Sequence, residues 1–410
     1  MTTHFAAYLD DQDLIRVEGG ESVTAFLPFT LTSGSKTIEL LPTEEEKTLR
    51  SPLPIDMSQS YTLSNAKGET CLLHYRDIVR QPIFDQLYAY DGEDLGAHYS
   101  KEKTTFAFWA PISQEVELLI NQTTYPMERT EKGVWRLELE GDWEKASYYY
   151  QHQVNGVTHI VHDPYALSSE ANSGASYVID RHKIERPIQR ATTQLDPTEA
   201  IIYELSVRDF SMQKEAGFHH PGTFPALLES PKHGEQTFGF DYLKSLGITH
   251  IQLLPLYDFG SVDETNPTSG YNWGYDPVQY NVPEGSFSTQ ANDPYQRILE
   301  LQQVIDAYHK ADLSLIMDVV YNHVYLSDEF AFERIVPGYF YRYDQDRQRT
   351  NGTFCGNDVA SERAMVRNYI KQSVKQWVQL YGFDGFRFDL MGILDRQTMM
   401  EIQEELVAIY

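Results

Sequence analysis

The sequence of 410 residues has only two cysteines, Cys71 and Cys355, which is too few for a disulfide framework. They are also too far apart in the sequence to form a zinc knuckle or a redox pair. Basic residues are scarce, with 33 Lys and Arg against 60 Asp and Glu, giving a formal net charge of −27. Because nucleic acids and anionic membranes are bound by clustered basic side chains, we expect neither as a partner.

Long apolar runs are absent as well. No stretch approaches the roughly 18 consecutive apolar residues that a membrane span needs. The first residues have no basic segment followed by an apolar one, so no secretory signal is visible. Together with the few cysteines, this predicts reduced thiols and a cytoplasmic protein. The apolar content of 41% is too high for a disordered chain, and the length predicts two or three domains.

Two β-rich modules are predicted ahead of residue 185, and we expect both to be β-sandwiches. Residues 1–100 contain short alternating stretches, such as Val23–Leu31 and Thr37–Leu41, which prolines and glycines interrupt. Residues 101–185 contain β-branched and aromatic runs about ten residues apart, which is typical of a sandwich. These runs are Phe106–Pro111, Val116–Ile120, Val134–Leu139, Tyr148–Val154 and Thr158–Val161.

From residue 197 to residue 410 the pattern changes to strands that alternate with helices. Near-continuous apolar runs predict parallel strands buried on both faces at 200–207, 249–255, 313–321 and 385–390. Apolar residues at three-to-four-residue steps predict helices between them, with starts at Asp293-Pro294 and Asp395 and an end at Gly382. Four βα units indicate a (β/α)-barrel or an open doubly wound sheet, whereas a complete barrel takes about 250 residues. We therefore expect the first half of a TIM-type barrel.

Charged and polar residues gather where these strands end. Arg387 and Asp389 are two residues apart, so they point to the same face of the predicted strand. The guanidinium would keep the carboxylate ionised, as a nucleophile requires. A structural Arg–Asp pair is an equally good interpretation of this cluster alone. Asp318 and Asn322 share a face of the preceding strand, and His323 follows them, although an Asn-His pair after a strand more often belongs to a turn.

The loop after the second predicted strand is rich in aromatic residues. It reads Tyr271-Asn-Trp-Gly-Tyr-Asp-Pro277, with three aromatics in five positions. Such residues suit stacking against sugar rings, but they also pack loop cores. Taken together and in order, the three clusters resemble glycoside hydrolase family 13, the α-amylase family. The loop, with Tyr280–Thr289 after it, resembles type I pullulanases in particular. Ile202–Asp209 and Thr249–Pro255 fit the same family, and residues 106–180 resemble a family 48 carbohydrate-binding module.

The resemblance implies a retaining hydrolase of α-1,6 branch linkages in pullulan, glycogen or limit dextrins. It implies that Asp389 is the nucleophile, with Arg387 beside it. It also implies that the −1 sugar stacks on Tyr275 and contacts His323, with Trp273, Asp276, Asp318 and Asn322 completing the substrate site. Retaining hydrolysis needs a second carboxylic acid about 5–5.5 Å from the nucleophile. The family places that glutamate after the fifth strand, which this chain does not contain.

Glu401, Glu404 and Glu405 do not replace the missing acid, since they lie on the last predicted helix and fit a solvated face. The chain is therefore expected to be inactive alone and to pair with a C-terminal barrel half. Two alternatives remain: an isoamylase-like debranching or branching enzyme, and a non-catalytic α-glucan-binding protein. No cofactor is expected to be required. Some family members bind calcium, and no loop has the spacing of a known calcium motif, so calcium binding is left open.

Overall fold

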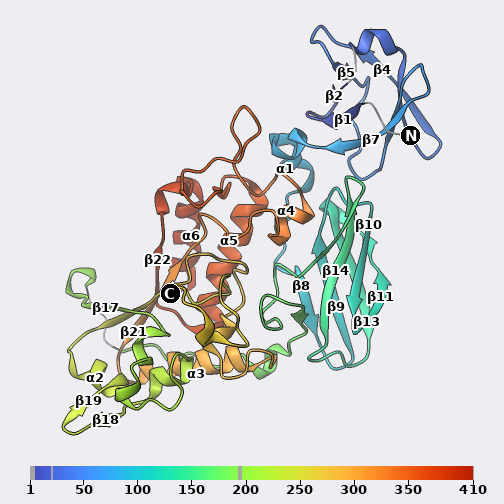
Figure 1. The fold of residues 1–410 in the computed structure, drawn as a ribbon. Helices are drawn as coiled ribbons and strands as arrows, with labels where there is room; N and C mark the ends of the chain where they lie inside the picture. Colours follow the sequence, from blue (N-terminus) through green and yellow to red (C-terminus); the bar gives the residue numbers. More distant parts are fainter. Residues whose placement is uncertain (1–4, 20–21, 193–195, 410) are drawn as a thin grey trace.

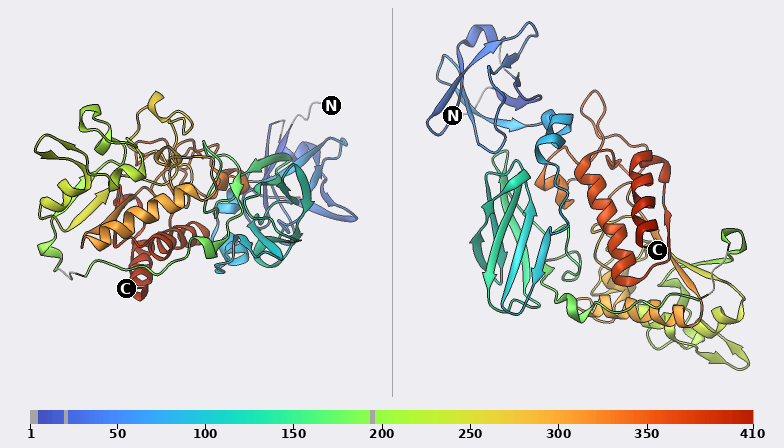
Figure 2. Two further views of the ribbon diagram at one scale, coloured as in Figure 1. Left: turned by 90° about the horizontal axis from the view of Figure 1, so that it is seen from below. Right: turned by 180° about the vertical axis from the view of Figure 1, so that it is seen from behind.

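The computed structural model describes residues 5–19, 22–192 and 196–409. It consists of a small β-barrel, a β-sandwich and a larger domain with a parallel sheet, which follow one another along the chain (Figure 1). Views from below and behind show the barrel at one end of the molecule, next to the sandwich (Figure 2). Within the described ranges, no helix combines the length and the apolar character needed to cross a bilayer.

The N-terminal module is a closed barrel, so the prediction of a sandwich for this segment was wrong. Its strands follow the order β1-β2-β5-β4-β3-β6-β7, and the parallel pairing of β1 with β7 closes the ring. Val23–Phe26, predicted as part of a strand, is a 3₁₀ helix. The strands are β1 (Ala6–Leu9), β2 (Leu14–Glu18), β3 (Phe29–Ser33), β4 (Lys36–Pro42), β5 (Thr48–Arg50), β6 (Thr62–Ser64) and β7 (Thr70–Tyr75).

The second module has two antiparallel sheets. One has the order β11-β10-β14-β15, with β16 also on β14, and the other has the order β12-β13-β9-β8. Alternate residues of β14 are buried, as a sandwich strand requires. The bounds are β8 (Gly96–Tyr99), β9 (Lys103–Trp109), β10 (Glu115–Ile120), β11 (Thr123–Pro126), β12 (Glu128–Arg129), β13 (Val134–Glu140), β14 (Ser147–Val154), β15 (Val157–Val161) and β16 (Ser176–Tyr177). The sandwich thus begins at Gly96, ahead of the predicted boundary at residue 101.

The third part contains four parallel strands in the order β17-β20-β21-β22, together with a small hairpin, β18 (Lys232–His233) and β19 (Gln236–Thr237). These strands are β17 (Ile202–Leu205), β20 (His250–Leu253), β21 (Ser314–Val319) and β22 (Gly385–Phe388). The prediction that all four are buried on both faces was wrong. Most of β21 is buried, whereas β17 and β22 are largely part-exposed or exposed, because they are the edges of the sheet.

Helices follow the parallel strands along the chain. They are α2 (Gly239–Ser245), α3 (Gln296–Lys310), α4 (Ala331–Ile335), α5 (Ala364–Gln376) and α6 (Arg396–Ile409), and α1 (Pro82–Tyr88) precedes the sandwich. Asp293 Oδ1 accepts hydrogen bonds from the amides of Tyr295 and Gln296 where α3 begins. A π-helix, Trp377–Tyr381, continues α5 and ends at Gly382 (φ +97°). The predicted solvated face of α6 is partly in contact with α5, since Lys371 bonds Glu401 at 3.0 Å and approaches Glu405 at 3.5 Å.

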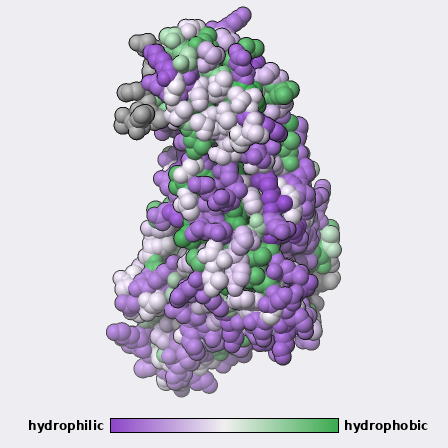
Figure 3. Space-filling view, turned by 90° about the vertical axis from the view of Figure 1, so that its right-hand side faces the viewer, coloured by the Kyte–Doolittle hydropathy of each residue, from purple (hydrophilic) through white to green (hydrophobic). Residues whose placement is uncertain are grey.

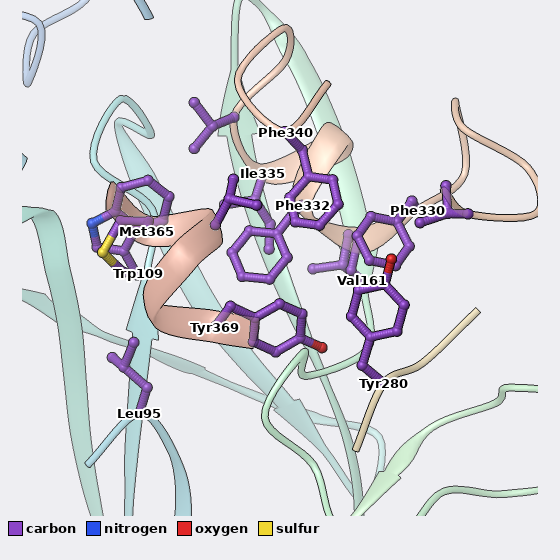
Figure 4. Packing of buried hydrophobic residues seen from close by; sticks show 14 of the residues in the cluster. Leu95, Trp109, Val161, Tyr280, Phe330, Phe332, Ile335, Phe340, Met365 and Tyr369 are labelled. Atoms are coloured by element: carbon purple, nitrogen blue, oxygen red, sulfur yellow. The ribbon is translucent and has the colours of Figure 1, made fainter. Parts of the chain in front are cut away.

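An aromatic core joins the sandwich to the parallel-sheet domain (Figure 4). Phe332 of α4 packs against Phe340 and Tyr369, with ring centroids 5.3 and 4.8 Å apart. Trp109 of β9 lies 5.6 Å from Tyr339. These contacts bury side chains of both domains in one continuous cluster. The sandwich therefore packs directly against the larger domain.

Polar contacts attach the N-terminal barrel and α1 to the same domain. Asp85 of α1 accepts hydrogen bonds from the Ala364 amide at the start of α5 and from the Tyr339 hydroxyl, at 2.9 and 2.6 Å. Arg347 bonds Asp77 at 2.8 Å and Asp10 at 3.2 Å, and so ties a loop of the parallel-sheet domain to the barrel. The face seen in Figure 3 is mostly hydrophilic with small scattered apolar groups, in keeping with the acidic composition.

Candidate active site

The charged group predicted at the strand ends is formed by two neighbouring strands. Asp318 of β21 lies opposite Arg387 of β22 in the parallel register. Asp389 follows β22 directly, and its amide donates to the Val319 carbonyl at 2.9 Å. The sheet therefore places three charged side chains side by side where β21 and β22 end.

Arg387 bridges the two carboxylates. Its Nη1 lies 2.8 Å from Asp389 Oδ1 and 3.0 Å from Asp318 Oδ1. The Asp318 side chain is 1% exposed and that of Asp389 15%, whereas the Arg387 side chain is 43% exposed. Burial raises the pKa of Asp318, although the hydrogen bonds from Tyr275 and Arg387 favour its charged form. The guanidinium thus holds Asp389 at the edge of the site while neutralising the deeper carboxylate.

Asn322, just after β21, contacts Asp389, and its neighbour His323 contacts Tyr275. Asn322 Nδ2 donates to the Asp389 carbonyl at 2.7 Å and lies 3.3 Å from Oδ2 of the same residue. His323 Nε2 donates to the Tyr275 carbonyl at 2.6 Å, since a carbonyl only accepts, and its Nδ1 lies 2.5 Å from Asn322 Oδ1. Burial lowers the pKa of His323, while this carbonyl and the charge of Asp389 oppose that shift. The imidazole is therefore fixed in orientation.

Tyr275 is held at both ends. Its hydroxyl donates to Asp318 Oδ2 at 2.7 Å, while its carbonyl accepts from His323. Gly274 precedes it with φ +92°, and a Cβ there would lie 2.8 Å from the Pro255 carbonyl, so only glycine fits. The half-buried ring thus lies beside the charged group and is held at its hydroxyl and at its backbone. This is the arrangement that a platform for a sugar ring requires.

The other two predicted loop residues have different surroundings. Asp276 accepts from Asn272 at 2.7 Å and braces the loop, and burial raises its pKa. Trp273 is 59% exposed, and its Nε1 donates to the Tyr271 hydroxyl at 2.5 Å. The structure thus brings together Asp318, Asn322, His323, Arg387, Asp389 and Tyr275. Asp276 contacts its own loop instead, and Trp273 lies on the surface of that loop.

A second loop, residues 350–358, borders the site and was missed by sequence reasoning. The Asn357 side chain bonds both the amide and the carbonyl of Val324, each at 2.9 Å, next to His323. The Val359 amide donates to the Asn322 carbonyl at 2.9 Å. These contacts are tertiary, and the only signal in the sequence was a polar Gly-Asn-Asp stretch of the kind found in many turns.

A buried acidic triad, also missed, lies near the predicted loop. Asp258, Glu264 and Glu284 place a carboxylate oxygen each within 4.8 Å of one another. Arg297, fully buried, approaches Glu264 at 3.3 Å, so the ionised triad would keep a surplus of two negative charges. Burial and the charge of Glu264 raise the pKa of Asp258 and Glu284, and Asp258 Oδ1 has no hydrogen-bond partner. Oxygen ligands of this kind suit a hard divalent cation such as Ca²⁺.

Comparison with known protein families supports the resemblance seen in the sequence. Residues 94–166 match carbohydrate-binding module 48, described as the isoamylase N-terminal domain. Residues 237–337 match the catalytic domain of α-amylase. The first match coincides with most of the sandwich and the second with the region that carries Tyr275, Asp318 and His323.

Individual relatives cover nearly the whole chain. Pullulanase of Bacillus subtilis (strain 168) is 36% identical over 421 aligned positions, which span 98% of this chain and 58% of the relative. The structure of pullulanase from Anoxybacillus sp. LM18-11 complexed with maltotetraose superposes with a TM-score of 0.93 at 40% identity, over 99% of this chain and 60% of that one.

A further match is the structure of type I pullulanase from Bacillus subtilis str. 168 complexed with maltose. Its TM-score is 0.92 at 34% identity, over 100% of this chain and 59% of that one. The chain thus spans about three fifths of the relatives that it matches. In its sequence and its fold the chain is similar to type I pullulanases, and it carries matches to carbohydrate-binding module 48 and to the catalytic domain of α-amylase.

Proposed function

We propose that this chain carries the nucleophile side of a retaining site that cleaves α-1,6 linkages in branched α-glucans. The observation that supports this most is the pair of contacts from Arg387 to Asp389 and Asp318, beside a fixed tyrosine ring and an oriented histidine. Asp389 would attack the anomeric carbon and form a glycosyl ester as the bond to the leaving oxygen breaks. Tyr275 would stack against the sugar, and His323 would contact its hydroxyl groups.

The proton for the leaving oxygen needs a separate acid. Among the described residues, the carboxylates bonded to Arg387 are Asp389 itself and Asp318. Asp318 is buried and is held by Tyr275 and Arg387, so it is poorly placed to give a proton to a substrate. We therefore propose that the 410 residues bind α-glucan. To hydrolyse it they need a further carboxylic acid, from outside the group formed by Asp389, Asp318 and Arg387.

The sheet supports closure by further strands, and we propose that its four βα units form half of a (β/α)₈ barrel. The outer edges of β17 and β22 have no strand partner among the described residues. Ile202 is 50% exposed on β17, while Leu390 and Met391, just after β22, are 46% and 54% exposed. Apolar side chains along open parallel edges fit pairing with more βα units, which would also supply the acid.

An activated substrate tests the nucleophile without the acid. In a maltotriosyl α-fluoride, fluoride leaves as an anion and needs no proton. Attack by Asp389 forms the C–O bond of the ester as the C–F bond breaks. We expect a covalent maltotriosyl adduct on Asp389 by mass spectrometry, together with no release of reducing ends from pullulan. Asp389→Asn should give no adduct, while the control Glu401→Gln, on α6, should react like the unchanged chain.

The outcome also separates the alternatives. A chain that is retarded by pullulan in affinity electrophoresis but forms no adduct would be a non-catalytic glucan-binding protein. A chain that forms no adduct and is not retarded would refute the proposal altogether. Hydrolysis of pullulan at an ordinary rate would refute the proposed need for an acid from elsewhere. Should a complete site prefer amylopectin to pullulan, the isoamylase-like alternative would be favoured.

We further propose that the acidic triad of Asp258, Glu264 and Glu284 holds a calcium ion with a structural role, and that the reaction itself needs no cofactor. The orphaned Asp258 Oδ1 and the uncompensated charge support this. Calcium at about a hundred times its dissociation constant should stabilise the fold by about 2.7 kcal/mol, seen as a rise in Tm. Glu284→Gln should abolish the rise. An unchanged Tm with calcium and with EDTA at pH 7.5 would contradict the proposal.

A further inference from the structure

Phe354 is unusual both in the exposure of its side chain and in its backbone conformation. It is 91% exposed, more than any other large apolar residue described, so its ring gains almost nothing from burial. It also has φ +62°, in the left-handed region where a Cβ is unfavourable and glycine is the usual residue. A bulky, strained and exposed residue of this kind points to a role outside the packing of the chain.

The loop that carries Phe354 is firmly built. Asp358 Oδ2 accepts from the Thr350 hydroxyl at 2.6 Å and from the Gly352 amide at 2.7 Å. Its Oδ1 accepts from the Thr353 amide at 2.8 Å. The Gly356 amide donates to Asn351 Oδ1 at 2.7 Å, which closes the turn around Phe354. The ring is therefore displayed at the tip of an ordered turn.

This turn borders the candidate active site. Asn357, three residues after Phe354, is bonded to the backbone of Val324, directly after His323. A Cβ on Gly352 would lie 3.2 Å from Ile393 Cδ1, in the segment that follows Asp389. The pKa of the neighbouring Cys355 thiol is raised by burial and also by the charge of Asp389. Phe354 thus belongs to the rim around the nucleophile.

We propose that Phe354 is a specificity-determining residue that stacks on a glucose ring of a bound α-glucan, at a subsite beside the group formed by Asp389, His323 and Tyr275. A pyranose has an apolar C–H face that fits a flat aromatic ring, and a neutral polymer is compatible with the acidic surface. The inference rests on the proposed function, because it places the platform next to that site. A turn that already fixes the ring lowers the entropy lost on binding.

Replacing the ring by glycine separates binding from folding. Phe354→Gly relieves the left-handed strain, so Tm should rise by roughly 2 °C. The affinity for maltotetraose, measured by titration calorimetry on the full chain, should fall about three- to tenfold. Phe354→Trp should bind maltotetraose as tightly as the unchanged chain, since it keeps an aromatic face. As a control, Val407→Ala shortens an exposed apolar side chain on α6. It should change neither the Tm nor the affinity for maltotetraose by a measurable amount.

The subsite and the proposed function can fail separately. If the unchanged chain binds maltotetraose and Phe354→Gly binds it equally well, the subsite is refuted while the proposed function stands. If the unchanged chain does not bind maltotetraose and forms no adduct with the α-fluoride, the proposed function fails and the subsite with it. Equal weakening by Phe354→Gly and Phe354→Trp would also refute stacking, because only the first removes the ring.

Discussion

Removing the positive charge of Arg387 is the most direct test of the electrostatics of the site. In Arg387→Met, Asp318 and Asp389 would face each other without the guanidinium that bonds both of them. The methionine keeps much of the aliphatic stem, so the change is mainly one of charge and hydrogen bonding. Asp318 is the residue most affected, because its side chain is 1% exposed and, among the residues that the structure describes, keeps the Tyr275 hydroxyl as its one hydrogen-bond donor.

The size of the effect follows from exposure. Removing one partner of a fully buried ion pair costs about 3–5 kcal/mol. Because the Arg387 side chain is 43% exposed, water screens part of this, and we expect a loss of about 2 kcal/mol in the free energy of unfolding at pH 7.5. As a control, Arg50→Met breaks a 2.7 Å pair with Asp13 whose side chains are 55% and 30% exposed, and should cost about 0.5 kcal/mol or less.

The sign of the pH dependence makes the test specific. The pKa of Asp318 is already raised in the folded protein, and loss of Arg387 raises it further. A carboxyl with a raised folded-state pKa stabilises the fold when protonated, and this stability is lost as the pH rises through that pKa. Urea unfolding followed by circular dichroism should therefore show a smaller loss at pH 5 than at pH 7.5.

A double variant completes the test. Arg387→Met combined with Asp318→Asn removes the unpaired charge, so it should recover more than half of the lost stability at pH 7.5. The reasoning is refuted if Arg387→Met costs no more than Arg50→Met, or if its cost is the same at both pH values. A double variant less stable than Arg387→Met would likewise show that Asp318 is not the stranded charge.

Two further predictions concern contacts away from the site. Asp85→Ala removes the acceptor of two hydrogen bonds, one from the Ala364 amide at the start of α5 and one from the buried Tyr339 hydroxyl. The free energy of unfolding should therefore fall by about 2–3 kcal/mol. Asp85→Asn should lower it by about half as much. An undiminished urea midpoint for Asp85→Ala would contradict this. Burial raises the pKa of Asp163 to about 6, against the hydrogen bonds from Tyr148 and Tyr165, so its share of the stability is present at low pH and is lost as the pH rises through 6. Between pH 5 and pH 7.5, Asp163→Asn should flatten the fall in the urea midpoint, and an unaltered slope would refute the assignment.

The strands of the parallel sheet and the larger strands of the sandwich were predictable because their patterns are local. Runs such as 148–154 and 313–321 carry β-branched and aromatic residues in sequence. The short strands β11 and β12 were missed because their residues are largely polar and exposed. Closure of the N-terminal barrel depends on β1 pairing with β7, far along the chain, and no local pattern indicates that partner.

The candidate site shows the same division. Asp318, Arg387 and Asp389 could be grouped from sequence, because parallel strands end at a common edge of the sheet. The loop at 350–358 joins the site through contacts between distant segments, such as that of Asn357 with the backbone of Val324. Glu264 and Glu284 were likewise hidden, since they reach Asp258 through loop geometry that spacing alone does not reveal.

The attachment of the loop to the N-terminal barrel has a consequence for engineering. Arg347 bonds Asp10 and Asp77 of the barrel, and Phe354 follows Arg347 by seven residues in the chain. The contacts of the barrel with Arg347 thus help to position the segment that carries Phe354 beside the nucleophile. Replacing the N-terminal barrel by an unrelated domain would remove Asp10 and Asp77, the partners of Arg347. We therefore expect such a replacement to change which sugars the site accepts.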